Sequence, residues 1–404
     1  MGRRLSLCYA APGHSLLSTS GTTRNILSLA QALSQWADVT VAFRRVLDPI
    51  RAEGYRVIAI EPNGTESNAM GDDNAARGLN PLGHLSYLRT LRSFSRNAAA
   101  SYDLVLEKGW HLSGYLLDAF RSRGVGGVLV ENDVRCWSEP LSGPRTVIKY
   151  ILHRAAQSVA SSCSRRVPII IAETEELKAM LVEQRGISRD QIEVVELGVD
   201  HSLFLPMDQE PARKSLGISP HATVLLYAGG MDKYHDLGPV IEALAHTGSS
   251  SLELHIVGDG EYRKRYEERA GRSQIAVKFH GRVPHHTVPE YIAASDLCVA
   301  PYCANAFHNR QVTFSTLKIP EYMACRRPVV SIPSGSLQNL VKDQISGFLF
   351  PNDVPSWVSF LRTLPSRERL KQMGESAART VQYRSWENTA SRYLEVCRRL
   401  TKHI

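Results

Sequence analysis

Long apolar runs and paired cysteines are both missing from this chain of 404 residues. No apolar run is long enough to cross a bilayer as a helix, so no membrane-spanning helix is expected. The seven cysteines are scattered and none forms a C-x-x-C pair, which argues against a zinc ribbon or a disulfide framework and fits a reducing compartment. The chain opens on a short apolar segment without the features of a secretory signal, so we expect a cytoplasmic location.

Two short motifs are missing as well. No G-x-G-x-x-G follows the first predicted strand, residues 5–11, which argues against a dinucleotide cofactor. The chain also has no D-x-D pattern, and its pair of adjacent aspartates, Asp72 and Asp73, falls in a polar loop at residues 63–80. A loop of this length without hydrophobic periodicity is typical of a functional or a disordered segment.

The overall composition is that of an ordinary folded protein. Hydrophobic residues make up 43% of the chain and charged residues 22%. A chain of this length is too long to fold around a single hydrophobic core, so two domains are predicted. The net charge of +8 leaves three interpretations open: a polyanionic partner, an anionic membrane surface, or no specific partner.

The first half of the chain alternates short apolar runs with helical patterns. This rhythm predicts a doubly wound α/β sheet of parallel strands, in which ligands bind at the carboxyl ends of the strands. Four polar residues follow two of those ends and are candidate ligand contacts: Lys108, His111, Asn132 and Asp133. The predicted strands are residues 5–11, 38–43, 55–60, 103–107, 127–131, 167–172 and 191–197, and the predicted helices include residues 24–36 and 81–100.

The segment from Arg145 to Arg166 has apolar residues at helical spacing together with several basic residues. It is either a helix packed on the domain core with a solvated basic face, or a helix attached to an anionic membrane. The first interpretation is favoured because a domain core explains the apolar stripe equally well. We therefore expect at most a weak, salt-sensitive contact with the inner face of the membrane.

The second half of the chain repeats the α/β rhythm, and glycines follow several of its strands. The pair Gly229 and Gly230 permits close approach of the backbone to a phosphate. The predicted strands of this half are residues 223–228, 252–257, 277–280, 297–300 and 328–332.

A short predicted helix, residues 317–325, combines the features of a nucleotide-sugar site. Thr316 is placed to cap it, and the free N–H groups of a helix start bind anions. Lys318 adds a mobile cation, and Glu321, one turn into the helix, can accept hydrogen bonds from a diol. A phosphate-binding helix start beside such a carboxylate suits a nucleotide-sugar. It predicts that the diphosphate binds the N–H groups and that the ribose binds Glu321.

This helix also resembles the donor-site segment of family 4 retaining glycosyltransferases, which have the two-domain GT-B fold. The usual form of that segment is close to P-x-K-x-x-E-Y-M-A-x-G-x-P-V-V. The full family motif is a Glu, seven residues and a second Glu. Glu321 matches the second Glu, and Thr313 stands at the position of the first. Arg326 stands where Gly is usual. A left-handed backbone at Arg326 would cost about 1 kcal/mol. The matching residues are Lys318, Glu321, Tyr322, Met323, Ala324, Pro328, Val329 and Val330.

Further family hallmarks recur in the same order along the chain. They include V-G-D-G at residues 257–260, F-x-G-R-V-P at residues 279–284 and A-S-D-L at residues 294–297. The resemblance implies a GT-B fold, in which two Rossmann-like doubly wound domains face each other across a cleft. The implied parts are an acceptor-binding domain at residues 1–197, a nucleotide-sugar-binding domain at residues 198–382 and a helix crossing back to the first domain at residues 383–404.

The resemblance also implies roles for individual residues. Lys233 and His235 stand near the positions at which the family places an Arg and a Lys that bind the diphosphate. With Lys318 they are the predicted catalytic residues, because the chemistry needs charge on the leaving diphosphate. The predicted donor-binding residues are Gly21, Gly229, Gly230, Gly258, Gly281, Arg282, Val283, Thr316, Leu317, Ile319 and Glu321, and the acceptor-side candidates are Lys108, His111, Asn132 and Asp133.

By resemblance, the expected reaction moves a sugar from a UDP- or GDP-linked donor to a glycan, a lipid-linked saccharide or a small metabolite. It retains the anomeric configuration and needs no cofactor and no metal. We expect no nucleic-acid partner, and the oligomeric state stays open. Two other classes remain: a nucleotide-sugar epimerase of the same fold, which would consume the donor without an acceptor, and a non-catalytic subunit, which would bind the donor without turnover.

Overall fold

The computed structural model describes residues 3–17, 20–48, 52–61, 81–134, 137, 142–249, 251–272 and 275–401. The chain divides into two compact units, each described here by itself. Unit 1 consists of Met1–Gly198, Thr313–Ser315 and Trp386–Ile404, and unit 2 consists of Val199–Val312 and Thr316–Ser385. Asp72, Asp73 and the whole of the polar loop at residues 63–80 lie outside the described residues.

Unit 1 is built on a seven-stranded sheet in the order β3-β2-β1-β4-β5-β6-β7. Every neighbouring pair is parallel, and the order reverses beside β1, so the predicted doubly wound topology is confirmed. The strands are short and apolar because helices cover both of their faces. They are β1 (Leu5–Ala11), β2 (Ala37–Phe43), β3 (Tyr55–Ala59), β4 (Leu104–Lys108), β5 (Gly126–Glu131), β6 (Ile169–Ala172) and β7 (Ile192–Val194).

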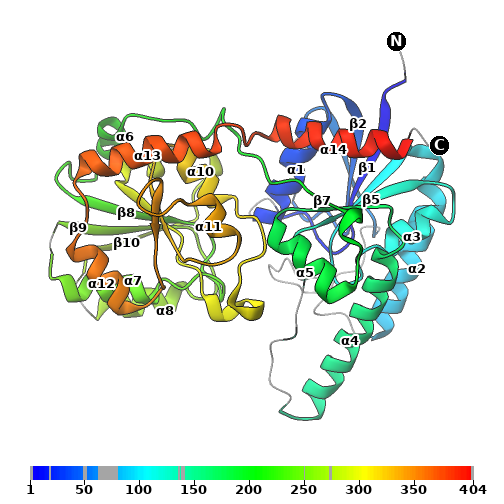
Figure 1. The fold of residues 1–404 in the computed structure, drawn as a ribbon, viewed down its shortest axis with the longest axis horizontal. Helices are drawn as coiled ribbons and strands as arrows, with labels where there is room; N and C mark the ends of the chain where they lie inside the picture. The colour runs from blue at the N-terminus through cyan, green and yellow to red at the C-terminus, as the bar shows by residue number, and fades with distance from the viewer. Residues whose placement is uncertain are drawn as a thin grey trace. The chain divides into compact units, whose positions relative to one another are not determined.

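The helices of unit 1 fall on the two sides of this sheet (Figure 1). On one side, α1 packs against α14, and on the other α3 packs against α2 and α4. The first helix begins three residues earlier than predicted, because the Ser20 hydroxyl accepts a hydrogen bond from the Thr23 N–H group. The helices are α1 (Gly21–Leu33), α2 (Pro81–Ala98), α3 (Tyr115–Arg121), α4 (Pro144–Ser164), α5 (Glu175–Arg185) and α14 (Trp386–Thr401).

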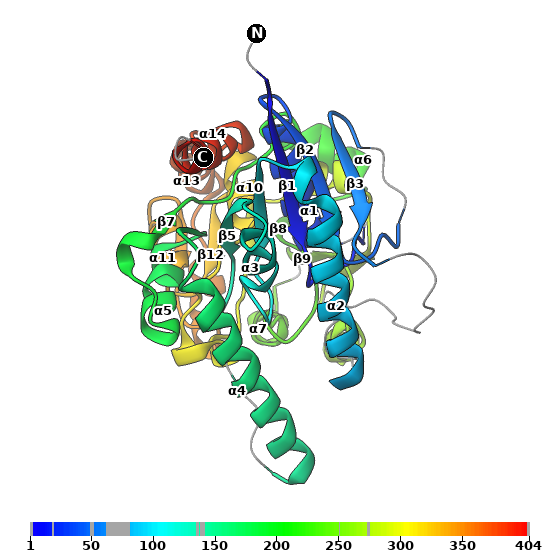
Figure 2. The ribbon, with the colours of Figure 1, turned by 90° about the vertical axis from the view of Figure 1, so that its right-hand side faces the viewer.

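Helix α4 departs from the prediction that its apolar stripe packs on the domain core. Only Ala160, Cys163 and Ser164, near its C-terminal end, are buried. Its N-terminal half extends beyond the rest of unit 1 in both views (Figures 1 and 2). Periodicity predicts which side chains share a face but not whether another element covers that face. The exposed fractions of the large apolar side chains there are 40% for Val147, 57% for Ile148, 58% for Ile151 and 52% for Leu152.

Unit 2 holds a six-stranded sheet in the order β10-β9-β8-β11-β12-β13, again parallel throughout. Helices α6, α10 and α13 lie on one side of it and α7, α8 and α12 on the other (Figure 1). The strands are β8 (Thr223–Ala228), β9 (Leu252–Val257), β10 (Val277–Gly281), β11 (Leu297–Val299), β12 (Val329–Ser331) and β13 (Gly347–Leu349). The helices are α6 (Gln209–Ser215), α7 (Gly238–Thr247), α8 (Arg263–Gly271), α9 (Val288–Ala294), α10 (Lys318–Ala324), α11 (Ser336–Leu340), α12 (Val354–Arg362) and α13 (Arg367–Val381).

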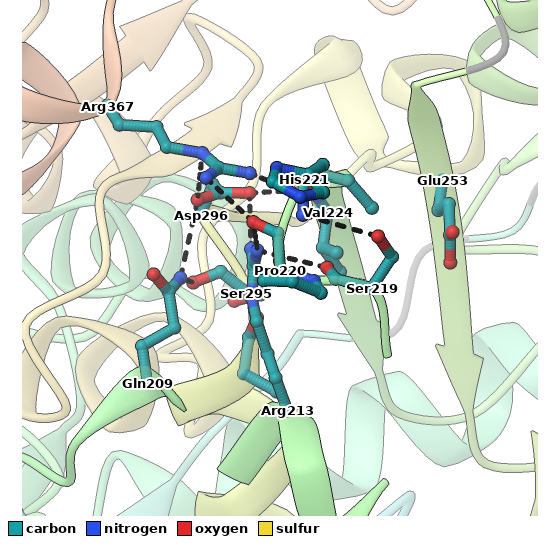
Figure 3. Close-up of polar contacts among 12 residues, drawn as sticks. Gln209, Arg213, Ser219, Pro220, His221, Val224, Glu253, Ser295, Asp296 and Arg367 are labelled. Carbon is teal, nitrogen blue, oxygen red and sulfur yellow. Dashed lines mark hydrogen bonds and ion pairs between the residues drawn. The ribbon is translucent and has the colours of Figure 1, made fainter. Parts of the chain in front are cut away.

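A buried ion pair joins α6 to the sheet of unit 2 (Figure 3). The Asp296 carboxylate, just before β11, accepts hydrogen bonds from Arg213 Nη2 at 2.8 Å and from the Val224 N–H group at 2.7 Å. Both charged side chains are 4% exposed. The Arg367 Nε atom lies 3.6 Å from the same carboxylate. The A-S-D-L hallmark therefore has a structural role here: its aspartate fixes the start of β11 to β8.

None of the described helices is long and apolar enough to cross a membrane.

Candidate functional site

The carboxyl ends of β8 and β9 meet in unit 2 with little room between their backbones. The Gly258 N–H group donates to the Gly281 carbonyl at 2.7 Å, and the Gly229 N–H group donates to the Val257 carbonyl at 2.9 Å. A Cβ atom at Gly258 would overlap the Gly229 carbonyl, and the Gly258 φ angle of +126° also disfavours a side chain. Glycine is thus needed at Gly258 for the two strand ends to approach each other.

Lys318, the first residue of α10, places its ammonium at this edge. Its Nζ atom donates to the Tyr227 hydroxyl at 3.1 Å and lies 4.5 Å from the centre of the Tyr227 ring. It also lies 5.6 Å from the Tyr302 ring centre. Burial lowers the pKa of Lys318 to about 7, against the opposing attraction of Asp232 and Glu321. An amine that is half protonated near neutral pH gains charge readily when an anion arrives.

His235 and Asp232 complete the group of titratable side chains beside Lys318. The His235 Nδ1 atom lies 2.9 Å from Asp232 Oδ1. Burial, and then the nearby Lys318 charge, lower the pKa of His235 to about 4, although Asp232 opposes this shift. Burial raises the pKa of Asp232, but His235, the Tyr234 N–H group and Lys318 together outweigh burial and leave that pKa below its usual value. At neutral pH the imidazole is therefore neutral, with Nδ1–H directed at Asp232 and Nε2 left as a hydrogen-bond acceptor.

Three buried tyrosines, Tyr227, Tyr302 and Tyr322, pack beside these groups. The Tyr227 hydroxyl donates to the Gly230 carbonyl. The Tyr322 hydroxyl donates to the Ala228 carbonyl at 2.9 Å and accepts from the Ala228 N–H group at 2.7 Å, which ties α10 to the end of β8. All three rings, including that of Tyr302, are almost fully buried. Their packing holds the segment after β8 in one position.

The start of α10 differs from the prediction in one respect. Thr316 does not cap the helix: Leu317 holds the N-cap position, and the Thr316 hydroxyl accepts a hydrogen bond from the Tyr302 hydroxyl at 2.7 Å. The sequence contains a suitable capping residue, but a tyrosine distant in sequence takes its oxygen. Ile319 is buried in the first turn, and Glu321 is half-buried beside Lys318.

The remaining predicted donor-side residues of unit 2 lie around this group without joining it. Lys233 is exposed, and its Nζ atom lies 5.0 Å from the centre of the Tyr234 ring. Gly281 ends β10 with a φ angle of +69°. The Arg282 Nε atom lies 3.8 Å from Asp259 Oδ2, on an exposed side chain, and Val283 is half-buried.

The predicted residues of unit 1 are dispersed over its strand ends. Lys108 is 1% exposed, and its ammonium lies 2.8 Å from the Glu173 carboxylate in a buried ion pair. The His111 ring lies 4.5 Å from the Trp110 ring, measured between centroids. The remaining three are Asn132, which is half-buried, and Asp133 and Gly21, which are exposed, Gly21 as the first residue of α1.

Thr313 and Arg326 are the two positions that depart from the family segment. The Thr313 carbonyl accepts a hydrogen bond from Thr174, the residue that caps α5. Arg326 has a φ angle of +56°, so the left-handed conformation expected at this position is present. Among the described residues, no three or more His, Cys, Asp or Glu side chains are grouped as metal ligands.

Sequence reasoning overlooked Asp232, Tyr227 and Tyr302, which surround Lys318 and His235. The Asp-x-x-His spacing was a usable signal, because residues three apart in a turn can meet. The tyrosines gave none, since aromatic residues in and after β-strands are ordinary core residues.

Two parallel α/β units with this strand order define a GT-B fold, and solved structures support that description. Sucrose-phosphate synthase from Thermosynechococcus elongatus is 20% identical, with a TM-score of 0.77 over 99% of this chain and 100% of that one. HepE from Anabaena, solved in complex with UDP-glucose, is 17% identical, with a TM-score of 0.71 over 97% of this chain and 99% of that one. At these low sequence identities, the structural similarity supports the fold alone.

The family model matches a segment that lies, apart from Thr313–Ser315, within unit 2. Residues 222–365 match the family model described as "Glycosyl transferases group 1". The D-inositol 3-phosphate glycosyltransferase of Thermomonospora curvata is 32% identical over 251 residues, which cover 56% of this chain and 56% of that protein. That of Geodermatophilus obscurus is 28% identical over 325 residues, which cover 74% and 67%. The chain thus spans little more than half the length of most of the curated relatives it matches.

Proposed function

We propose that this protein is a glycosyltransferase that moves a sugar from a nucleotide-sugar donor to an acceptor. The observation that carries the proposal is the group formed by Lys318, Asp232 and His235 at the carboxyl edge of the unit 2 sheet. This group lies within residues 222–365, the part that matches a glycosyltransferase family model. The donor diphosphate binds here, against Lys318 and the backbone of Gly229 and Gly230.

The charge state of the site suits a leaving diphosphate. Lys318 has a pKa of about 7 and His235 of about 4, so the site holds little positive charge at neutral pH. A bound diphosphate raises both pKa values, because an adjacent negative charge favours the protonated forms. Donor binding therefore takes up protons, and the charge gained stabilises the diphosphate as the glycosidic bond breaks.

Other residues around the group complete the donor site. Glu321 accepts hydrogen bonds from the ribose hydroxyls, and backbone groups from Gly281 to Val283 receive the base. Lys233 adds an exposed cation that meets the outer phosphate. The acceptor binds to unit 1, whose candidates are His111, Asn132 and Asp133.

We further propose a retaining reaction that needs no metal, with a UDP-linked donor. The donor class is supported by HepE, which was solved with UDP-glucose, and the transfer reaction by the curated relatives, which are glycosyltransferases. The acceptor is a glycan, a lipid-linked saccharide or a small metabolite.

The test is a donor screen followed by product analysis. Thermal shift should single out UDP-sugars over GDP-, TDP- and ADP-sugars, and calorimetry in buffers of different ionisation enthalpy should show proton uptake on binding. With an acceptor, NMR should find the donor's anomeric configuration in the product, with EDTA present. Donor consumed without any acceptor would instead indicate an epimerase, and binding without turnover on a broad acceptor panel would indicate a non-catalytic subunit.

A further inference from the structure

The N-terminal half of α4 presents a large apolar surface that no described element covers. Val147, Ile148, Ile151 and Leu152 are all exposed, although each is large enough to anchor a core. Singly exposed apolar residues are ordinary, but a contiguous group marks an interaction site. The group lies on the part of α4 that extends from unit 1 (Figure 2).

The positions of these side chains define one face of the helix. At about 100° per residue, the four large residues together with Ala155 and Val159 fall within an arc of about 140°. Arg145 and Lys149 lie at one border of the arc, and Arg154 lies at the other. All three cations are exposed.

The opposite face of the helix is occupied. The ring of Trp137 lies 5.6 Å from that of Tyr150 and 5.7 Å from that of His153, measured between centroids. Trp137 therefore packs on the face of α4 that lies opposite the apolar face, and it does not cover the apolar side chains.

The charged side chains on α4 and α2 are all basic. Neither α4 nor α2 contains an Asp or a Glu, and α2 adds three exposed arginines, Arg89, Arg92 and Arg96. On the neighbouring helix α3, Asp118 is already paired with Arg121 and Arg166. A partner that covers the apolar face must therefore be apolar at its centre and anionic at its rim.

We propose that the N-terminal half of α4 docks on an anionic lipid bilayer. The apolar face inserts at the boundary between headgroups and acyl chains, and Arg145, Lys149 and Arg154 meet the lipid phosphates. A helix with an apolar face bordered by cations is suited to lie in that interface. A second copy of the chain fits less well, because pairing two such faces would bring their cations together. This proposal does not depend on the transfer reaction.

The test is flotation of the full-length protein with two kinds of vesicle. One kind is phosphatidylcholine alone, and the other is phosphatidylcholine with about a third of phosphatidylglycerol, an anionic lipid. We expect at least about tenfold tighter binding to the anionic vesicles at low salt. Because apolar insertion is not screened, part of this binding should persist at high salt. The double variant Ile148→Ser, Ile151→Ser should weaken binding at least about tenfold at both salt concentrations. Lys149→Glu should weaken it mainly at low salt.

Two controls keep the test specific. Ile345→Ser makes the same change at an exposed isoleucine of unit 2 and should leave binding unaltered. Ile151→Trp keeps the face apolar, so it should bind like the parent and shift its fluorescence to the blue on anionic vesicles.

Three outcomes would overturn the proposal. The first is an absence of vesicle binding, and the second is binding that high salt abolishes entirely, which would leave electrostatics alone. The third is a parent protein that sediments as a dimer and becomes monomeric in the double variant, which would assign the face to a second copy of the chain.

Discussion

At the scale of single residues, the candidate site depends on how burial changes charge. The three residues chosen from the sequence as catalytic have very different surroundings. Lys318 is held among Tyr227, Tyr302 and Asp232, His235 is tied to Asp232, and Lys233 is exposed. The same type of side chain therefore contributes differently at positions 233 and 318.

We predict that Lys318→Met lowers kcat by about 10²–10³-fold, the scale of losing one preorganised donor to a developing anion. Lys233→Ala should lower kcat by about tenfold, because solvent screens an exposed cation. Steady-state kinetics with saturating donor measure both values. Near-equal losses for the two variants would contradict the assignment of the main role to Lys318.

The pH dependence of kcat/KM should report the pKa of Lys318. Its pKa is about 7, so its ammonium is charged below that pH and neutral above it. The value of kcat/KM should fall about tenfold per pH unit as the pH rises above 7, since this parameter reports groups of the free enzyme. Lys318→Arg stays charged and should lose this decline, even at a lower rate. The same decline in that variant would assign the titration to another group.

At the scale of elements, short segments are held by contacts distant in sequence. Helix α10 has seven residues and no side-chain cap, yet Tyr322 and Ile319 anchor it to the sheet. Similarly, α6 is joined to β8 and β11 through Arg213 and Asp296 (Figure 3). Tertiary packing stabilises such elements more than intrinsic helix propensity does.

The buried pair of Asp296 and Arg213 should be costly to break. Asp296→Ala leaves the guanidinium buried without its partner and should lower the free energy of unfolding by about 3–5 kcal/mol. Asp190→Ala, at an exposed residue, should change it by less than about 0.5 kcal/mol. Urea unfolding followed by circular dichroism measures both, and equal stabilities would show that the pair is not coupled to the fold.

The left-handed backbone at Arg326 strains the folded state, and a glycine at this position should remove the strain. Arg326→Gly should raise the free energy of unfolding by about 1 kcal/mol, the penalty that a Cβ atom incurs at a φ angle of +56°. Arg272, an exposed arginine at a helix C-cap with a φ angle of −72°, is the matched control. Arg272→Gly should instead destabilise by about 0.5–1 kcal/mol. A loss of stability in both variants would mean that the Arg326 side chain outweighs its backbone strain.

At the scale of the whole molecule, the two units have separate cores and separate sheets. Of the predicted donor-binding residues, all except Gly21 belong to unit 2. A ligand stabilises the part of a protein that binds it. The response of each unit to the nucleotide therefore distinguishes the donor site from the acceptor side.

We predict that UDP shifts the calorimetric unfolding transition of unit 2 and not that of unit 1. At 100 times its dissociation constant, a ligand adds about 2.7 kcal/mol to the free energy of unfolding. Glu321→Gln should weaken UDP binding by about 1–3 kcal/mol, the value of a hydrogen bond to a charged group, and so reduce the shift. An unchanged shift in this variant would remove Glu321 from the ribose site.

The amino-acid sequence by itself determined the α/β class and most of the strands. Strands β1, β8 and β9 were predicted to the residue, because an apolar run bounded by polar or glycine residues is a local signal. The order of glycine-ending strands and the segment around Lys318 likewise indicated where a nucleotide-sugar would bind. All these features are read from neighbours in the chain.

Only the tertiary structure decided which groups meet and which surfaces stay open. It made Thr316 the hydrogen-bond partner of Tyr302 instead of a helix cap, and it brought Asp232 into contact with His235 and into electrostatic interaction with Lys318. It also left the apolar face of α4 exposed, where periodicity had indicated a core. Burial, and with it the pKa of a lysine or the role of an apolar face, depends on atoms contributed by distant parts of the chain, which a local pattern does not contain.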